Sequence, residues 1–154
     1  HEAVHQLNEE VAHLRLNKWL EEGSAEYFST CYLNNGTLRL GSIDPSTYPV
    51  WWLEELAVST NLALNLENGS VIPLRSIITD RGGPSMRQHV NLYYLHWWTL
   101  AHYVFETHPA QALQLLQDPV CEEQPIAKAP FASARAQARC VLEQLSKMVE
   151  CDIH

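Results

Sequence analysis

The chain carries little positive charge. Only ten of its 154 residues are lysine or arginine, against eighteen aspartates and glutamates, so the formal net charge at pH 7 is −8. Nucleic-acid binding relies on clustered basic side chains that neutralise phosphates, and the sequence contains no such cluster. The composition therefore excludes a typical DNA- or RNA-binding protein.

Long apolar runs are missing as well. No segment approaches the ~18 consecutive apolar residues of a transmembrane helix, which argues against a membrane span in this chain. Hydrophobic residues still make up 46% of the sequence and charged residues 18%, a balance typical of globular domains and not of disordered chains. A length of 154 residues suits one domain with a substantial core.

Cysteine pairs of the Cys-x-x-Cys kind are absent, which argues against a structural zinc cluster. The four cysteines are Cys31, Cys121, Cys140 and Cys151. A disulfide among the last three would suit an exported protein, whereas reduced thiols would suit a cytoplasmic one. The sequence does not choose between these compartments, and it leaves the oligomeric state open.

What the sequence does contain is a metal-binding pattern at its start, His1-Glu2-Ala3-Val4-His5. Residues four apart on a helix lie one turn above each other, so His1 and His5 can direct imidazole nitrogens at one zinc ion. Glu2 then projects beside them as the candidate general base. A third protein ligand would leave the fourth position open for water, which a catalytic zinc requires and a structural zinc lacks.

Two glutamates further along supply the missing ligand and its support. Glu26 follows Glu22 by one helical turn, so both carboxylates share one helix face. We predict that Glu22 binds zinc directly. Glu26 is predicted to accept the second N–H of a ligand histidine, which would fix its tautomer and raise its basicity. The alternative for this pair is an exposed acidic face without a metal.

Residues 19–28, Trp-Leu-Glu-Glu-Gly-Ser-Ala-Glu-Tyr-Phe, give the pattern a context. With the HExxH pattern, this segment resembles the gluzincins, metallopeptidases whose zinc is held by two histidines and a glutamate. It is similar to the glutamate helix of the aminopeptidase N group and closer to the small bacterial peptidase MA-like domains. In that family the ligand is the glutamate directly before the glycine, which implies Glu22 and not Glu21.

Two later segments extend the resemblance over roughly residues 1 to 106. Residues 72–78, Ile-Pro-Leu-Arg-Ser-Ile-Ile, match a linker of the peptidase MA-like domains, and residues 94–104 resemble their aromatic helix. The resemblance implies that Tyr94 stabilises the oxyanion of peptide hydrolysis; a core tyrosine bonded to a backbone carbonyl is the alternative. His96 is expected to support a ligand histidine or to pack in the core.

Members of this family carry a region before the HExxH pattern, usually with a strand that holds the peptide substrate. Because this chain begins at His1, we expect it to be a fragment of a longer protein cut at the motif. His1 would then lie on a fraying helix terminus, where its α-amine could compete as a ligand.

The apolar pattern predicts a mainly α single domain, with a zincin-like helical catalytic subdomain and at most a short β-hairpin. Metal-binding helices are expected within residues 1–33. Gly23 inside the second helix indicates that something approaches the backbone closely there. An apolar stripe opposite the histidines is expected to pack on the domain: Val4, Leu7, Val11 and Leu14.

The rest of the chain divides into helices and connections. The turn signal Asn34-Asn35-Gly36 precedes a predicted short strand over 37–43. Further helices are predicted over residues 48–66, 89–107, 110–117 and 132–150. Loops or linkers are predicted over residues 70–88 and 118–131, where proline and glycine are frequent.

Together these features predict a zinc-dependent peptidase that hydrolyses peptide bonds through a metal-activated water, with a peptide or protein as substrate. The metal ligands would be His1, His5 and Glu22, and the catalytic residues Glu2 and Tyr94. Since the aminopeptidase motif Gly-x-Met-Glu-Asn is missing, an endopeptidase or an unassigned peptidase is favoured. A zinc hydrolase acting on a non-peptide bond remains possible from the motif. The alternative from another class is a catalytically inactive helical binding or scaffold module with a degenerate peptidase fold, suggested by the tryptophans Trp51, Trp52, Trp97 and Trp98.

Overall fold

The computed structural model describes residues 1–53, 56 and 58–117; the predicted linker 118–131 and helix 132–150 lie outside them. The described part is mainly α, as predicted, with one two-stranded hairpin. In chain order the elements are α1 (Glu2–Gln6), the π-helix η1 (Leu7–Val11), α2 (Lys18–Ser29), β1 (Tyr32–Asn34), β2 (Thr37–Arg39), the 3-10 helix η2 (Val50–Leu53), α3 (Leu62–Glu67), α4 (Leu74–Thr79), α5 (Val90–Thr107) and α6 (Pro109–Gln117).

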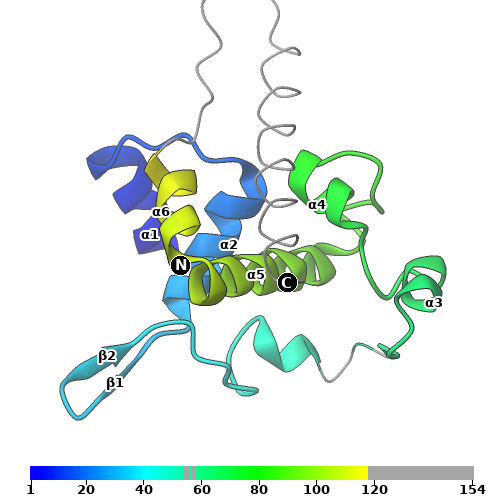
Figure 1. Cartoon of the computed structure of the whole chain (residues 1–154), viewed down its shortest axis with the longest axis horizontal. Helices are drawn as coiled ribbons and strands as arrows, with labels where there is room; N and C mark the ends of the chain where they lie inside the picture. The colour runs from blue at the N-terminus through cyan, green and yellow to red at the C-terminus, as the bar shows by residue number, and fades with distance from the viewer. Residues whose placement is uncertain (54–55, 57, 118–154) are drawn as a thin grey trace, which may run out of the picture.

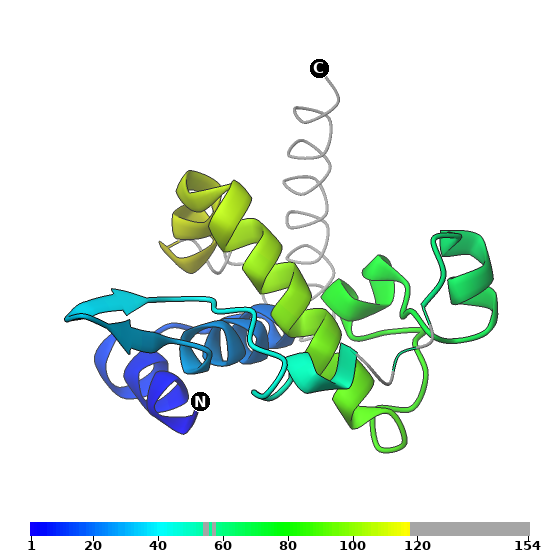
Figure 2. The same cartoon turned by 90° about the horizontal axis from the view of Figure 1, so that it is seen from below.

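The crossing of α2 and α5 forms the centre of the fold (Figures 1 and 2). Gly23 of α2 lies at this crossing. A Cβ atom at position 23 would stand 2.5 Å from the carbonyl oxygen of Trp97 and 3.0 Å from the Cβ of Ala101. Only glycine lets the two backbones come this close, which confirms the predicted close approach.

The hydrophobic core surrounds this crossing. Trp19 from α2 and Trp97 from α5 are almost completely buried, and such aromatic side chains contribute most of the apolar area removed from water. The main cluster consists of Trp19, Leu20, Ile72, Ile77, Ile78, Tyr93, Trp97, Val104, Ala112 and Leu115. These residues come from α2, α4, α5, α6 and the approach to α4, so α2 is fixed by helices from the later part of the chain.

In contrast, α1 and η1 lie on the outer side of α2 (Figure 2), and none of their residues, Glu2–Val11, is buried. The prediction that the apolar stripe packs on the domain holds only in part: Leu7 is 53% and Val11 69% exposed, whereas Val4 and Leu14 are half-buried. The face that α1 turns toward α2 is the one that carries His1 and His5. Since the stripe lies opposite the histidines, its members Leu7 and Val11 face solvent.

A short antiparallel hairpin follows α2, with Leu33 opposite Leu38. Asn35 and Gly36 both adopt positive φ, 49° and 79°, which suits the two-residue turn that matches the twist of a hairpin. The predicted turn is confirmed, but the second strand ends earlier than predicted. Gly41 has a φ of 56° and lies directly on the ring of Tyr27, so the chain bends back toward α2 there.

The predicted helix over residues 48–66 is wrong. Within the described residues of that range, only η2 and α3 are helical. Asn61 accepts the Leu64 N–H and caps α3, and the buried Asn65 side chain bonds both backbone groups of Ser59 at 2.7 and 2.9 Å. Such side-chain bonds to the backbone compete with helix formation, so they end the helix that the apolar residues favour.

The predicted loop over 70–88 also contains a helix, α4, whose Ile77 and Ile78 join the core. It spans too few residues for hydrophobic periodicity to reveal. The helices predicted over 89–107 and 110–117 are confirmed as α5 and α6. No helix in the described part combines the length and apolar character that crossing a membrane requires. Cys31 is exposed and free, and the other three cysteines lie outside the described residues.

Candidate metal centre

Three side chains from two helices converge at the contact of α1 with α2. His1 precedes α1, His5 lies on α1, and Glu22 lies on α2. The Nε2 atoms of the two histidines are 3.0 Å apart, and each lies 3.5 Å from Oε2 of Glu22. Among the described residues, this is the one group of three side chains close enough to share a metal ion.

The spacing of these three atoms suits zinc. Distances of 3.0, 3.5 and 3.5 Å define a triangle whose corners lie about 1.9 Å from its centre, slightly less than the ~2.0–2.2 Å of zinc bonds to nitrogen and oxygen. His1, His5 and Glu22 would together hold one zinc ion, and a set of three protein ligands leaves a fourth position for water. Two histidines and one glutamate form a ligand set typical of catalytic zinc.

The polar chemistry of the site also favours a cation. Oε2 of Glu22 is buried and has no hydrogen-bond donor in the part of the chain that the structure describes. A buried carboxylate oxygen without a donor costs free energy, since it has lost its water and gained no partner. A cation between Glu22 and the two imidazoles would compensate this oxygen.

Glu26 stands behind His1. Its side chain is only 5% exposed, and its Oε1 lies 2.9 Å from Nδ1 of His1, on the ring side that faces away from Glu22. The ring is turned so that this approach is an ion-pair contact and not an aligned hydrogen bond. Burial raises the pKa of Glu26 to about 7, although a hydrogen bond from Ser29 and the N-terminal amine partly oppose the shift. This is the place that the sequence predicts for a carboxylate supporting a ligand histidine.

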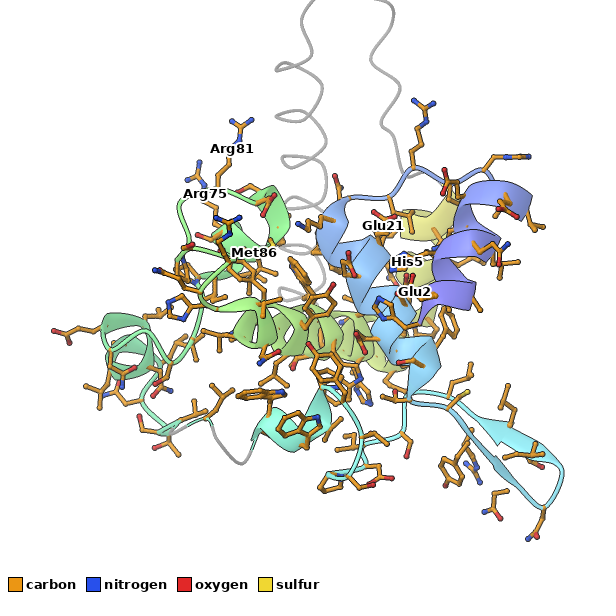
Figure 3. All side chains as sticks on the ribbon, turned by 180° about the vertical axis from the view of Figure 1, so that it is seen from behind. Glu2, His5, Glu21, Arg75, Arg81 and Met86 are labelled. Atoms are coloured by element: carbon orange, nitrogen blue, oxygen red, sulfur yellow. The ribbon has the colours of Figure 1, made fainter. Side chains whose placement is uncertain are left out.

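Glu21 takes a similar place behind His5, which the sequence did not predict. Its Oε1 lies 3.7 Å from Nδ1 of His5, and its side chain is 47% exposed. Figure 3 shows Glu2 and His5 on α1 with Glu21 on the facing helix α2. The sequence could have indicated this role for Glu21. Each of the two ligand histidines needs a carboxylate to orient it, and the helix with Glu22 and Glu26 carries Glu21 as a third acidic side chain.

Tyr94 reaches the site from α5. Its ring centroid lies 6.1 Å from that of His1. Burial raises the pKa of the Tyr94 phenol above its ordinary value, and the charge of Glu22 raises it further. Tyr94 therefore lies beside the proposed ligand His1.

Tyr48 lies at the same place, and sequence reasoning missed it. Its ring centroid lies 5.9 Å from that of Tyr94, and its hydroxyl donates to Oδ1 of Asn91 at 3.4 Å. Burial raises the pKa of Tyr48 to about 12, and the charges of Glu26 and Glu22 contribute. No sequence pattern around Tyr48 indicates a role at the site. Tyr48 belongs to an irregular segment, and only the folding of that segment brings it there.

The remaining candidates lie differently. Glu2 is exposed on the first turn of α1, directly after the first ligand. His96 donates its Nδ1–H to the carbonyl of Leu92 at 2.7 Å and accepts the N–H of Ile72 on Nε2 at 3.2 Å. Both ring nitrogens are therefore engaged with backbone, so the expectation that His96 supports a ligand is wrong and the packing alternative describes it.

Comparisons with models of protein families, with curated proteins and with solved structures find no match to this chain. The candidate site therefore depends on its own geometry: three converging ligand atoms, a buried carboxylate oxygen without a donor, and two phenols beside them.

Proposed function

We propose that this chain forms the metal-binding part of a zinc-dependent peptidase with a zincin-like arrangement of the gluzincin type. His1, His5 and Glu22 would hold Zn²⁺, and a peptide or protein would be the substrate. The observation that carries the proposal is the triangle of Nε2, Nε2 and Oε2 atoms, whose sides of 3.0 and 3.5 Å suit one zinc ion. The resemblance to peptidase MA-like domains supports the same assignment.

When bound, zinc would polarise the carbonyl of the scissile peptide bond and lower the pKa of a water molecule. Glu2 would accept a proton from the attacking water and deliver it to the leaving nitrogen. Its position on the first turn of α1, next to His1 and open to solvent, leaves its carboxylate free to reach a substrate. Glu26 and Glu21 would orient His1 and His5 from behind.

Peptide hydrolysis also needs a donor for the oxyanion that develops on the carbonyl oxygen. The resemblance points to Tyr94 for this role. A phenol is protonated at neutral pH, as a donor must be, and burial moves the pKa of Tyr94 further above neutrality. The proposal thus combines a candidate metal-ligand set, a candidate base and a candidate donor from α1, α2 and α5.

The experiment combines metal analysis of the protein with its hydrolysis of a quenched peptide library. We expect one zinc per chain in the wild type, little zinc in His5→Ala, and full zinc in Glu2→Gln. Glu2→Gln should hydrolyse peptides ~10²- to 10⁴-fold more slowly, since it removes the general base and keeps the ligands. Equal rates for wild type and Glu2→Gln would remove Glu2 from catalysis.

A helical scaffold module is the second candidate. The tryptophans support it only in part, because Trp97 and Trp98 are buried while Trp51 is 40% exposed. The hairpin gives it better support: Leu33 and Leu38 are 71% and 57% exposed, and exposed apolar patches often mark interaction surfaces. A wild-type protein that binds no zinc would favour this candidate over the peptidase.

A further inference from the structure

Four basic side chains lie on α2, α4 and the segment that joins α4 to α5. Lys18 is the first residue of α2, Arg75 lies on α4, and Arg81 and Arg87 lie between α4 and α5. All four are exposed, and we call them the basic patch. Figure 3 shows the side chains of Arg75 and Arg81 pointing away from the body of the molecule at the α4 end. The patch is a local exception in a chain whose net charge is −8.

A contact between α2 and the segment after α4 joins the members of the patch. Nζ of Lys18 donates to Sδ of Met86 at 3.2 Å, and Arg87 follows Met86 directly. Arg75 stands on the first turn of α4 and Arg81 comes shortly after its end, so this short helix keeps their backbones on the order of 10 Å apart. The four cations therefore belong to one surface.

These cations have no carboxylate partner within the residues that the structure describes. Every ion pair found there involves a histidine. Asp80 is the one acidic residue between Arg75 and Arg87. The sulfur that Lys18 contacts is a weak acceptor, and an ammonium has three donors, so Lys18 keeps donors for another partner. The field of unpaired cations attracts anionic groups from solution.

The patch begins one helical turn from the proposed metal ligand Glu22. Lys18 and Glu22 lie four residues apart on α2 and share one helix face. Nζ of Lys18 lies 5.5 Å from the ring centroid of Trp97, and the ring of Tyr94 contacts the same indole at 5.2 Å. Tyr94 in turn lies beside His1. Since an extended peptide advances ~3.3 Å per residue, a peptide at the metal would reach Lys18 within about two or three residues.

We propose that the basic patch selects the substrate: the preferred peptide carries acidic side chains on one side of the scissile bond, beginning about two or three residues from it. Lys18 would contact the first of these side chains, and the arginines of the patch would contact those beyond. The inference rests on the proposed function. An acidic side chain directly at the scissile bond would instead meet the exposed carboxylates of Glu2 and Glu21. The preference is therefore expected only at a distance from the bond.

The first test uses quenched peptides that differ only in one residue, Asp or Asn, placed at successive positions on either side of the scissile bond. The measured quantity is the ratio of kcat/KM for the Asp peptide to kcat/KM for the Asn peptide. We expect a ratio of about 2- to 5-fold at the distant positions on one side, as single exposed ion pairs give. The ratio should approach one at ~0.5 M salt, because salt screens exposed charges.

Variants of the patch then locate the preference. Lys18→Gln and Arg87→Gln should each lower the ratio at the preferred positions, and the double variant should bring it to about one. The matched control is Arg39→Gln on β2, which removes the same charge from an exposed position on the hairpin. It should leave the ratio unchanged. Because the ratio compares two peptides with one protein, a loss of folded protein does not imitate the effect.

A binding measurement separates this inference from the proposed function. Fluorescence anisotropy of labelled Asp and Asn peptides, with zinc removed by a chelator, should show tighter binding of the Asp peptide by wild type and no difference for the double variant. Zinc-dependent hydrolysis at equal rates for Asp and Asn at every position would overturn the inference and leave the peptidase standing. Binding of phosphatidylserine vesicles through the same cations, without a peptide preference, would overturn it in favour of a membrane surface. A wild type without zinc or hydrolysis would overturn both the peptidase and its substrate assignment.

Discussion

The two helices that carry the proposed ligands are held in different ways. Seven of the twelve residues of α2 are buried, and its Trp19 lies in the centre of the core. No residue of α1, Glu2–Gln6, is buried, and its polar contacts to α2 run through His1 and His5. The core therefore places Glu22, whereas the histidines depend on the site itself.

This difference shows that the site is only half preformed. Metal binding to His1 and His5 would join α1 to α2 and so stabilise their contact. Five predictions, from the largest expected effect to the smallest, test the contrast between the core-held and the site-held helix.

Gly23→Ala should have the largest effect on stability. The added Cβ would stand 2.5 Å from the carbonyl oxygen of Trp97, a backbone atom that can move only if α2 and α5 separate. We expect a loss of about 3 kcal/mol in the free energy of unfolding, measured with denaturant. Gly36→Ala is the control: it meets nothing within 4 Å and should cost about 1–2 kcal/mol from its positive φ alone. Equal losses would show that the crossing is not tight.

Glu26→Gln should weaken zinc binding ~10- to 100-fold, because it removes the carboxylate that contacts His1. Chelator competition measures this. Glu21→Gln should do less, since Glu21 is half exposed and lies 3.7 Å from His5. A larger effect at Glu21 would contradict the proposed support of His1 by Glu26.

In the metal-free protein, Glu26→Gln should remove a pH dependence of the free energy of unfolding. Burial raises the pKa of Glu26 from its ordinary 4.5 to about 7, so the folded state binds more protons than the unfolded state between these values. Metal-free wild type should therefore lose stability as the pH rises through that window, and Glu26→Gln should not. Unfolding with chelator at pH 5 and pH 8 measures the difference.

His96, which lies on α5 in the core-held part of the molecule, should contribute less to the free energy of unfolding. Burial lowers the pKa of this imidazole, although its bond to the Leu92 carbonyl opposes the shift. Its stabilisation is therefore present above the unfolded pKa of ~6.5 and is lost as the pH falls below it, since protonation breaks the bond from Ile72. Relative to His96→Gln, wild type should lose about 1 kcal/mol from pH 7.5 to pH 5.5. Equal pH dependence of stability in wild type and His96→Gln would contradict this assignment.

Leu7→Ser and Val11→Ser should have the smallest effects. Both side chains are mostly exposed, and surface substitutions usually change stability by less than about 0.5 kcal/mol. Thermal unfolding measures this, with the fully buried Val104→Ser as the comparison. Losses that match Val104→Ser would show that the stripe on α1 and η1 is covered in solution.

Much of this molecule follows from local sequence. The helical period places His1 below His5 and Glu22 below Glu26; His5, Glu22 and Glu26 lie on helices as predicted, and His1 is the N-cap of α1. The Asn35-Gly36 turn and the helices α5 and α6 were also predictable, because long apolar periodicity and turn chemistry act over neighbouring residues. The helix over 48–66 was not, since Asn61 and Asn65 bond to the backbone and interrupt it.

The sequence by itself determined which side chains share a helix face and which residue types suit zinc. Only the tertiary structure decided that α1 turns its histidines, and not its apolar stripe, toward α2, and that Tyr48 arrives beside Tyr94. The physical reason is that periodicity acts within a few residues of the chain. The face that turns inward depends on the packing free energy of all the helices together, here on a crossing of α2 and α5 that only Gly23 permits.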